Sequence, residues 1–355
     1  MFGYRLPEPL PWDLVAGPIA AAEAALARLD ECLVASPMAE GWRERNHLAA
    51  VCAEALLRGD LVHLEDLVLH EAGMDVRAPT ADLTRARAAL QFRRRLETCR
   101  VTETWHRAER EALGPDADRN DVPRREEGEG RAAETVATGD VELDAALAAV
   151  DAAISRVDGT LAGTKRSRLI YDEDRGDRVR RDAWRDLVAR TDTMPAVLAA
   201  VVIVDGWEAL APVEHREPLG WTLAAAILRS RGTTRFLPSL AIGVRSVPRL
   251  RWQARDPMTR LMALLEALSA AAETGRMDHE RWLTSRTLLL AKCAGRRRAS
   301  HLPALVDLVL RTPLVSAGMI AKELRITPRA AQNLVAELGL RELTGRERYR
   351  AWGVL

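Results

Sequence analysis

Two short amphipathic helices joined by a tight turn are predicted between Ser316 and Gly339, and they constrain the fold more than any other stretch. Ser316 is a natural N-cap for the first helix, since its hydroxyl can accept a free backbone N–H of the first turn. Thr327 and Pro328 restart a helix, with threonine as the cap and proline at the first helical position, where a missing N–H is tolerated. The apolar positions that would join the two helices are Ile320, Ala321, Leu324, Ala331, Leu334, Val335 and Leu338. Small alanines facing each other permit the close crossing of a helix-turn-helix.

The polar residues of the second helix indicate what it contacts. Arg329, Gln332 and Asn333 share one face of that helix at spacings of i, i+3 and i+4. In the major groove of DNA, arginine pairs with guanine, whereas glutamine and asparagine pair with adenine. We therefore predict that these three residues read base edges, and that Thr327 at the start of the helix also lies at the DNA.

A short β-hairpin wing is predicted after Gly339. Thr344 and Gly345 form a plausible turn between two short strands. Arg346, Arg348 and Arg350 alternate along the second strand, so they share one face and would meet phosphates. The C-terminal stretch thus predicts a winged helix with a basic wing. A small helical hairpin with a solvated polar face, or a winged helix that binds protein, are the alternatives.

The distribution of charge agrees with one DNA-binding module at the C-terminal end. The 355-residue chain has a formal net charge of +1. From Lys292 onward, however, 12 lysines or arginines stand against 5 acids, so the rest of the chain is acidic. A nearly neutral protein with a basic C-terminal region is expected when a single domain binds nucleic acid. No apolar run approaches the roughly 18 residues that cross a membrane, so we expect a cytoplasmic protein.

A mostly α-helical fold is predicted, because alanine, leucine and arginine dominate and strand signals are nearly absent before residue 340. We predict a helical N-terminal domain over 1–113, a disordered linker over 114–139, a second helical domain over 140–300, and the winged helix over 301–355. The linker has almost no large apolar residue to offset its ordering entropy. The principal helices are expected at 18–35, 39–58, 61–70, 81–112, 140–157, 178–190, 194–210, 218–231, 257–274, 278–294 and 302–311.

One stretch of the second helical domain resembles the motif of Fic proteins, which transfer AMP or related groups to hydroxyls. It runs Glu-His-Arg-Glu-Pro-Leu-Gly-Trp-Thr-Leu from Glu214, so His215 matches the general base of that family and Gly220 matches one glycine. Leu219 stands where the family has its magnesium-holding acid, and residues 221–223 replace the Asn-Gly-Arg that cradles phosphate. Because such transfer depends on positioning and charge, the resemblance implies an inactive relative. His215 is the one weak catalytic candidate, and we expect no metal and no cofactor.

Nearly the whole chain is similar to an uncharacterised family carried on alphaproteobacterial plasmids. The matching stretches begin Leu-Val-His-Leu-Glu-Asp-Leu at Leu61 and Leu-Val-Ser-Ala-Gly-Met-Ile at Leu314. Members of that family pair a domain of unknown function with a C-terminal helix-turn-helix. The resemblance implies binding to double-stranded DNA, by a transcriptional regulator or plasmid-maintenance factor that we expect to act as a homodimer. A Fic-like nucleotidyl transferase and a helical scaffold are the alternative functions.

Overall fold

The computed structural model describes residues 8–74, 78–114, 166–213, 219–294, 300–344 and 350–354, together with Tyr4 and Leu6. This part of the chain is mostly helical and ends in a small three-stranded sheet. The prediction of a mostly α fold is therefore confirmed. The predicted linker beyond Gly114 and the helix expected at 140–157 lie outside the described residues.

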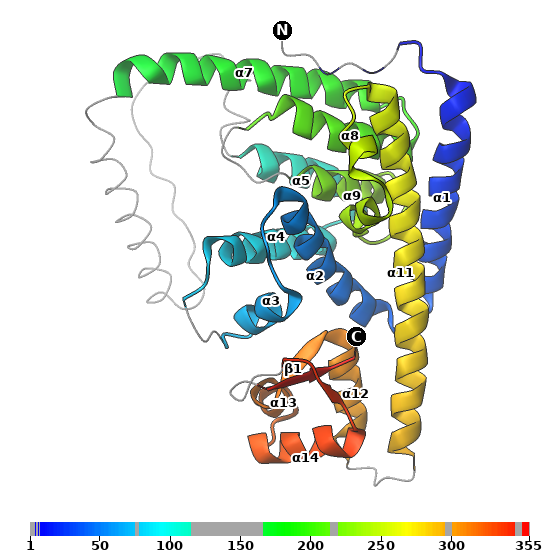
Figure 1. The fold of residues 1–355 in the computed structure, drawn as a ribbon, viewed down its shortest axis with the longest axis vertical. Helices are drawn as coiled ribbons and strands as arrows, with labels where there is room; N and C mark the ends of the chain where they lie inside the picture. The colour runs from blue at the N-terminus through cyan, green and yellow to red at the C-terminus, as the bar shows by residue number, and fades with distance from the viewer. Residues whose placement is uncertain are drawn as a thin grey trace, which may run out of the picture.

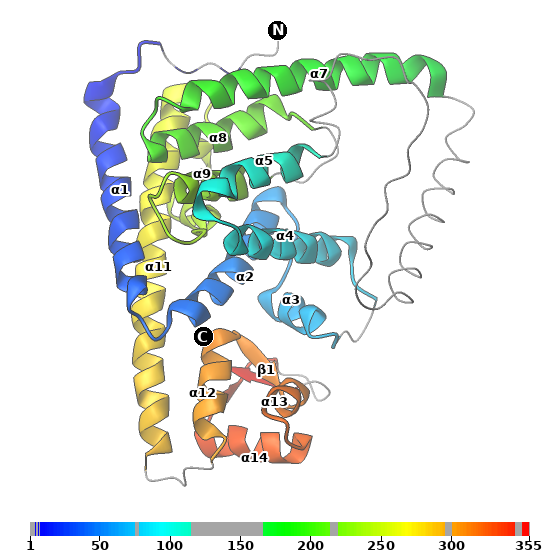
Figure 2. The same ribbon diagram turned by 180° about the vertical axis from the view of Figure 1, so that it is seen from behind.

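A long helix, α11 (Pro257–Cys293, 37 residues), forms the spine of the molecule, and α1 (Trp12–Val34) runs along its first half (Figure 1 and Figure 2). Asp256 caps α11 by accepting the Thr259 N–H at 2.8 Å. The sequence predicted two helices here, separated near Gly275, and that prediction is wrong. A β-carbon at Gly275 would lie 3.0 Å from side-chain atoms of both Leu29 and Trp42. The glycine therefore allows neighbouring helices to approach closely, and α11 continues through it.

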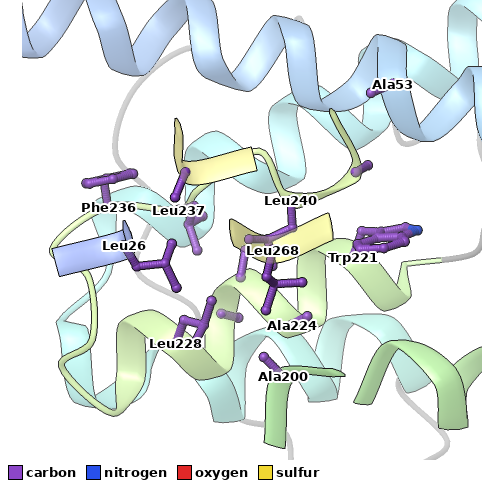
Figure 3. Packing of buried hydrophobic residues seen from close by; sticks show 14 of the residues in the cluster. Leu26, Ala53, Ala200, Trp221, Ala224, Leu228, Phe236, Leu237, Leu240 and Leu268 are labelled. Carbon is purple, nitrogen blue, oxygen red and sulfur yellow. The ribbon is translucent and has the colours of Figure 1, made fainter. Parts of the chain in front are cut away.

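The hydrophobic core surrounds α8 (Ala196–Leu210), in which almost every residue is buried. A helix that is apolar on all sides over most of its length must lie inside the protein. The helices α9 (Gly220–Ser230), α7 (Arg166–Thr191) and α11 pack against α8, and α5 (Thr104–Leu113) packs on α9. Figure 3 shows Leu26 of α1 in the same cluster as Ala200, Trp221 and Leu268. Helices from both sides of the predicted linker thus share one core, while the domain boundaries themselves stay predictions.

Three further helices complete the body: α2 (Ala39–Arg58), α3 (Leu64–Glu71) and α4 (Ala81–Thr98), with a 3-10 turn at Val101–Glu103. The helix predicted over 81–112 is divided here into α4 and α5. The guanidinium of Arg229 donates to the carbonyls of Leu96, Glu97 and Cys99 at 2.9, 3.1 and 3.0 Å. These carbonyls lie at or just past the end of α4, where helical partners run out, so a distant side chain stabilises this helix end.

Residues 236–247, between α9 and α11, are mostly buried and contain a 3-10 helix (Leu240–Ser246). The short α10 (Arg249–Trp252) follows this segment, and none of its residues is buried. Arg93 is fully buried against residues 236–247 and donates to the carbonyls of Leu237 and Pro238, each at 3.1 Å. Arg93 is the first of three consecutive arginines, a run that is usually found on a solvated helix face. It is buried here because these carbonyls, together with the Glu54 carboxylate 3.5 Å away, compensate its charge inside the protein.

The C-terminal part consists of α12 (Leu302–Arg311), β1 (Leu314–Ser316), α13 (Ala317–Leu324), α14 (Pro328–Leu338), β2 (Arg341–Glu342) and β3 (Ala351–Gly353). The strands are antiparallel in the order β1-β3-β2, and Trp352 pairs with Val315 on one side and Glu342 on the other. None of the helices described is long and apolar enough to cross a membrane.

Candidate nucleic-acid interface

The helix-turn-helix forms as its capping residues predict. The Ser316 hydroxyl accepts the Met319 N–H at 3.2 Å at the start of α13. At the start of α14 the Thr327 hydroxyl accepts the Ala330 N–H, also at 3.2 Å. Ile320 and Ala331 are fully buried between the two helices. Local sequence therefore determines where both helices begin and which faces they bury.

The turn between the two helices contains a backbone conformation that the sequence did not reveal. Arg325 has φ 54° and ψ 45°, which places it in the left-handed region. A residue with a β-carbon is unfavourable there by about 1 kcal/mol or more, and glycine is the usual occupant. The side chain of Arg325 is exposed. The tight turn is therefore made at an exposed arginine.

The exposed face of α14 carries the predicted base-reading residues. Arg329, Gln332 and Asn333 are all exposed, and none forms a hydrogen bond or ion pair within the described residues. Figure 1 shows α14 at the end of the molecule opposite α7, where the last turns of α11 reach it. The structure thus places these three side chains on one free surface next to the exposed Thr327. Their role in binding DNA stays a prediction.

The hairpin that follows α14 is partly described. Strands β2 and β3 pair antiparallel, as predicted for the two short strands after α14, and the Leu343 N–H extends the pairing to the carbonyl of Ala351. The prediction that Arg350 lies within the second strand is wrong, because β3 begins at Ala351. Arg350 is exposed, donates to the Glu342 carboxylate from Nε at 2.7 Å, and lies over the Trp352 ring with its guanidinium carbon 5.6 Å from the ring centre. Arg346 and Arg348 lie outside the described residues.

A buried arginine of the body holds the helix-turn-helix in place. The Arg45 guanidinium, on α2, donates to the carbonyls of Leu310 and Val309 at 2.6 Å each, to Val354 at 2.9 Å and to Thr312 at 3.3 Å. Most of these carbonyls are at the C-terminal end of α12, where intrahelical partners are missing and the helix dipole favours a cation. Burial lowers the pKa of Arg45 to about 10. This contact could not be predicted from the sequence, because every acceptor is more than 260 positions away from Arg45.

Further contacts join the C-terminal part to the body. A β-carbon at Gly41 of α2 would lie 3.0 Å from the Leu310 carbonyl oxygen, so the two backbones approach closely. The Lys292 ammonium at the end of α11 donates to the Leu338 carbonyl at 2.9 Å and so caps the C-terminus of α14. The Ser316 hydroxyl also contacts Met74 Sδ at 2.9 Å. The recognition helix therefore has a defined orientation relative to α2 and α11.

The catalytic candidate, His215, lies outside the described residues. The positions that follow it are used for packing. A β-carbon at Gly220 would lie 3.2 Å from Trp207 Cβ. The Thr222 hydroxyl, where the Fic motif has its glycine, instead contacts the Glu54 carboxylate at 3.2 Å and Arg93 at 3.2 Å inside the core. The resemblance to Fic proteins stays a prediction.

Three comparisons bear on the identity of the chain. Residues 169–294 match a family model described as a protein of unknown function, DUF1612. Residues 302–355 match a helix-turn-helix DNA-binding domain. The uncharacterized protein y4cF of Sinorhizobium fredii (strain NBRC 101917 / NGR234), an alphaproteobacterium, is 40% identical over 355 aligned positions, which cover 92% of this chain and 93% of that protein.

Proposed function

The chain belongs to the family of y4cF, and on this premise we propose that the chain binds DNA sequence-specifically through α14. The similarity to y4cF extends over almost the full length of this chain, so it includes both the DUF1612 region and the helix-turn-helix domain. The observation that carries the proposal is the free polar face of that helix. Arg329, Gln332 and Asn333 have side chains that match base edges, and none is engaged within the described residues.

The basic wing supplies the second half of the proposed interface. Three arginines stand at alternate positions just before β3, namely Arg346, Arg348 and Arg350. On a wing they would contact phosphates, which fix the register of the protein on DNA but do not read sequence. Arg350 already pairs with Glu342, so its contribution to phosphate binding is expected to be smaller than that of Arg348.

The architecture supports a regulatory role on DNA, which is part of the proposal. One helix-turn-helix makes few base contacts, and such modules reach useful specificity as dimers on two-part sites. We therefore propose a homodimer that acts as a transcriptional regulator or plasmid-maintenance factor. The body holds each recognition helix through Arg45 and Lys292, so it would set the orientation of the two helices in such a dimer.

The proposal is tested by selecting bound sites from random duplex DNA with the full chain and titrating the selected site across a salt series. Phosphate contacts make the logarithm of the affinity fall linearly with the logarithm of salt concentration. Arg348→Ala should weaken binding to all sequences alike and lower that slope by about one. Arg178→Ala, an exposed arginine of α7 at the opposite end of the molecule, is the matched control and should change neither.

Two results would contradict the proposal. If no duplex is enriched or bound at low salt, the protein is not a DNA-binding protein, and a helical scaffold whose C-terminal domain binds protein takes its place. If Arg178→Ala and Arg348→Ala lower the salt slope equally, the binding is a non-specific effect of total charge. Labelling of a protein by ATP that is lost in His215→Ala would instead identify a nucleotidyl transferase.

A further inference from the structure

A cavity of about 510 Å³ opens between the helices of the body, well away from α14. Its walls come from α2, α8 and α9 on one side and from α10 and the first turns of α11 on the other. Ligand sites of helical proteins are found between helices and have volumes of about 300–1,000 Å³. The cavity therefore has the size and the position of a small-molecule site.

Two indole rings form much of the apolar wall. Trp221 of α9 is 6% exposed, and Trp252 of α10 is partly buried. Leu57, Val204 and Leu264 add aliphatic surface between them. Figure 3 shows Trp221 at the edge of the labelled core cluster. Indole faces favour flat rings and cations, because the ring quadrupole is negative at the face.

Most of the charged groups around the cavity are already compensated inside the protein. The Arg260 guanidinium binds the Asp205 carboxylate at 2.8 and 3.1 Å and also donates to the carbonyls of Ala254 and Arg255. Glu54 accepts the Thr222 hydroxyl at 3.2 Å and pairs with Arg93. These groups therefore have little capacity left for a ligand.

Glu208 is the exception. Its carboxylate lines the cavity and forms no hydrogen bond or ion pair within the described residues. Glu208 is an exposed residue, yet desolvation of its carboxylate at the cavity wall raises its pKa; Asp205 adds to that shift and Arg58 opposes it. Arg58 itself is bound to Asp60 at 3.1 Å. An arriving cation would therefore meet a carboxylate that is paired with no cation among the described residues.

We propose that this cavity binds a small organic cation in which a protonated amine is joined by a short chain to an aromatic ring. The ammonium group pairs with Glu208, and the ring packs on Trp221 and Trp252. Arg255 is exposed at the rim, so an anionic ligand is the competing possibility that the experiment must separate. The proposed site is independent of the DNA-binding surface.

The test uses the full chain and three probes that share a phenyl ring and a two-carbon chain: phenethylamine, 2-phenylethanol and 3-phenylpropionate. Binding is measured by isothermal titration calorimetry and by saturation-transfer NMR at millimolar probe concentrations. We expect phenethylamine to bind, with at least tenfold weaker binding of the alcohol and of the carboxylate. Preference for the carboxylate, or equal binding of all three probes, would overturn the proposal, and so would no detectable binding of phenethylamine.

Two variants locate the site. Glu208→Gln keeps the shape of the side chain and removes its charge, so it should lower the affinity for phenethylamine at least tenfold without raising that for 3-phenylpropionate. Trp252→Leu should weaken binding of all three probes. The matched control is Glu31→Gln, a carboxylate of α1 with a side chain 79% exposed, which should bind as wild type does. If Glu208→Gln binds phenethylamine with wild-type affinity, Glu208 is not the partner of the ammonium group. The comparison of the three probes on the wild-type protein still tests the proposed preference for a cation if a variant does not fold.

Discussion

Replacing Arg45 by leucine should loosen the helix-turn-helix from the body while leaving the central core intact. The substitution removes the guanidinium that binds the carbonyls of Val309, Leu310, Thr312 and Val354. Two of these bonds are buried, so water does not readily replace the lost donor. The effect should therefore be local to α12 and to the strands and helices that follow it.

The magnitude follows from the number of carbonyls left without a partner. A buried polar group that loses its partner costs about 1–3 kcal/mol. Counting only the two buried bonds, we expect a loss of about 2–6 kcal/mol in the stability of this region, which lies among the large effects of single substitutions. A loss of about 3 kcal/mol corresponds to a more than hundredfold rise in the opening equilibrium of this region. Arg45→Lys keeps the charge with fewer donors and should lie between wild type and leucine.

Amide hydrogen exchange resolves this local effect, because it reports opening region by region. In Arg45→Leu, exchange should accelerate in α12 and α13 and stay unchanged in α8. The matched control is Arg43→Leu, since Arg43 is exposed on the same helix two residues earlier. Equal exchange rates of α12 in the Arg43 and Arg45 variants would refute the idea that Arg45 fixes the helix-turn-helix.

Three further changes have defined outcomes. Arg325→Gly removes a left-handed arginine and should raise the free energy of unfolding by about 1 kcal/mol; a lower value in urea unfolding would contradict this. His47 is buried, and its pKa is lowered well below 6.5. As pH falls below 6.5, the unfolded chain therefore takes up a proton at this histidine before the folded chain does, and the free energy of unfolding should fall by at most about 1.4 kcal/mol per pH unit. His47→Gln should flatten that pH dependence, and an unchanged slope would mean that another group causes it. Limited proteolysis should first cleave within the predicted linker, 114–139, as the composition of that stretch predicts. The two products should co-elute in size-exclusion chromatography, because helices from both sides of the linker share one core. Separation of the products would show that this core does not hold them together.

The elements that the sequence predicted well are those specified by neighbouring residues. Ser316 and Thr327 cap helices within three positions of themselves, and α8 is apolar from Ala196 to Val204. The exposed positions of α14 follow from the same periodicity. Local capping and hydrophobic patterning are therefore sufficient to predict the helix-turn-helix and which residues of α14 are exposed.

The features that the sequence could not predict depend on partners far along the chain. Arg229 donates hydrogen bonds to carbonyls at the end of α4, although it lies 130 positions or more away in the sequence. Arg93 is buried because carbonyls 144 and 145 positions away accept hydrogen bonds from its guanidinium. Gly275 suggested a helix break until its contacts with α1 and α2 showed why a glycine is needed inside α11. Charged and glycine residues have several local interpretations, and tertiary contacts decide among them.

The central claim is that α14 reads bases, and the most direct measurement compares the base preference of wild type with that of Asn333→Ala on the selected DNA site. The asparagine is exposed and is unengaged within the described residues, so the substitution should leave the fold unchanged. The account predicts a loss of about 1–3 kcal/mol in binding to that site and a relaxed preference at one base position, with unchanged affinity for non-specific DNA. Unchanged affinity and unchanged preference at every position would contradict it.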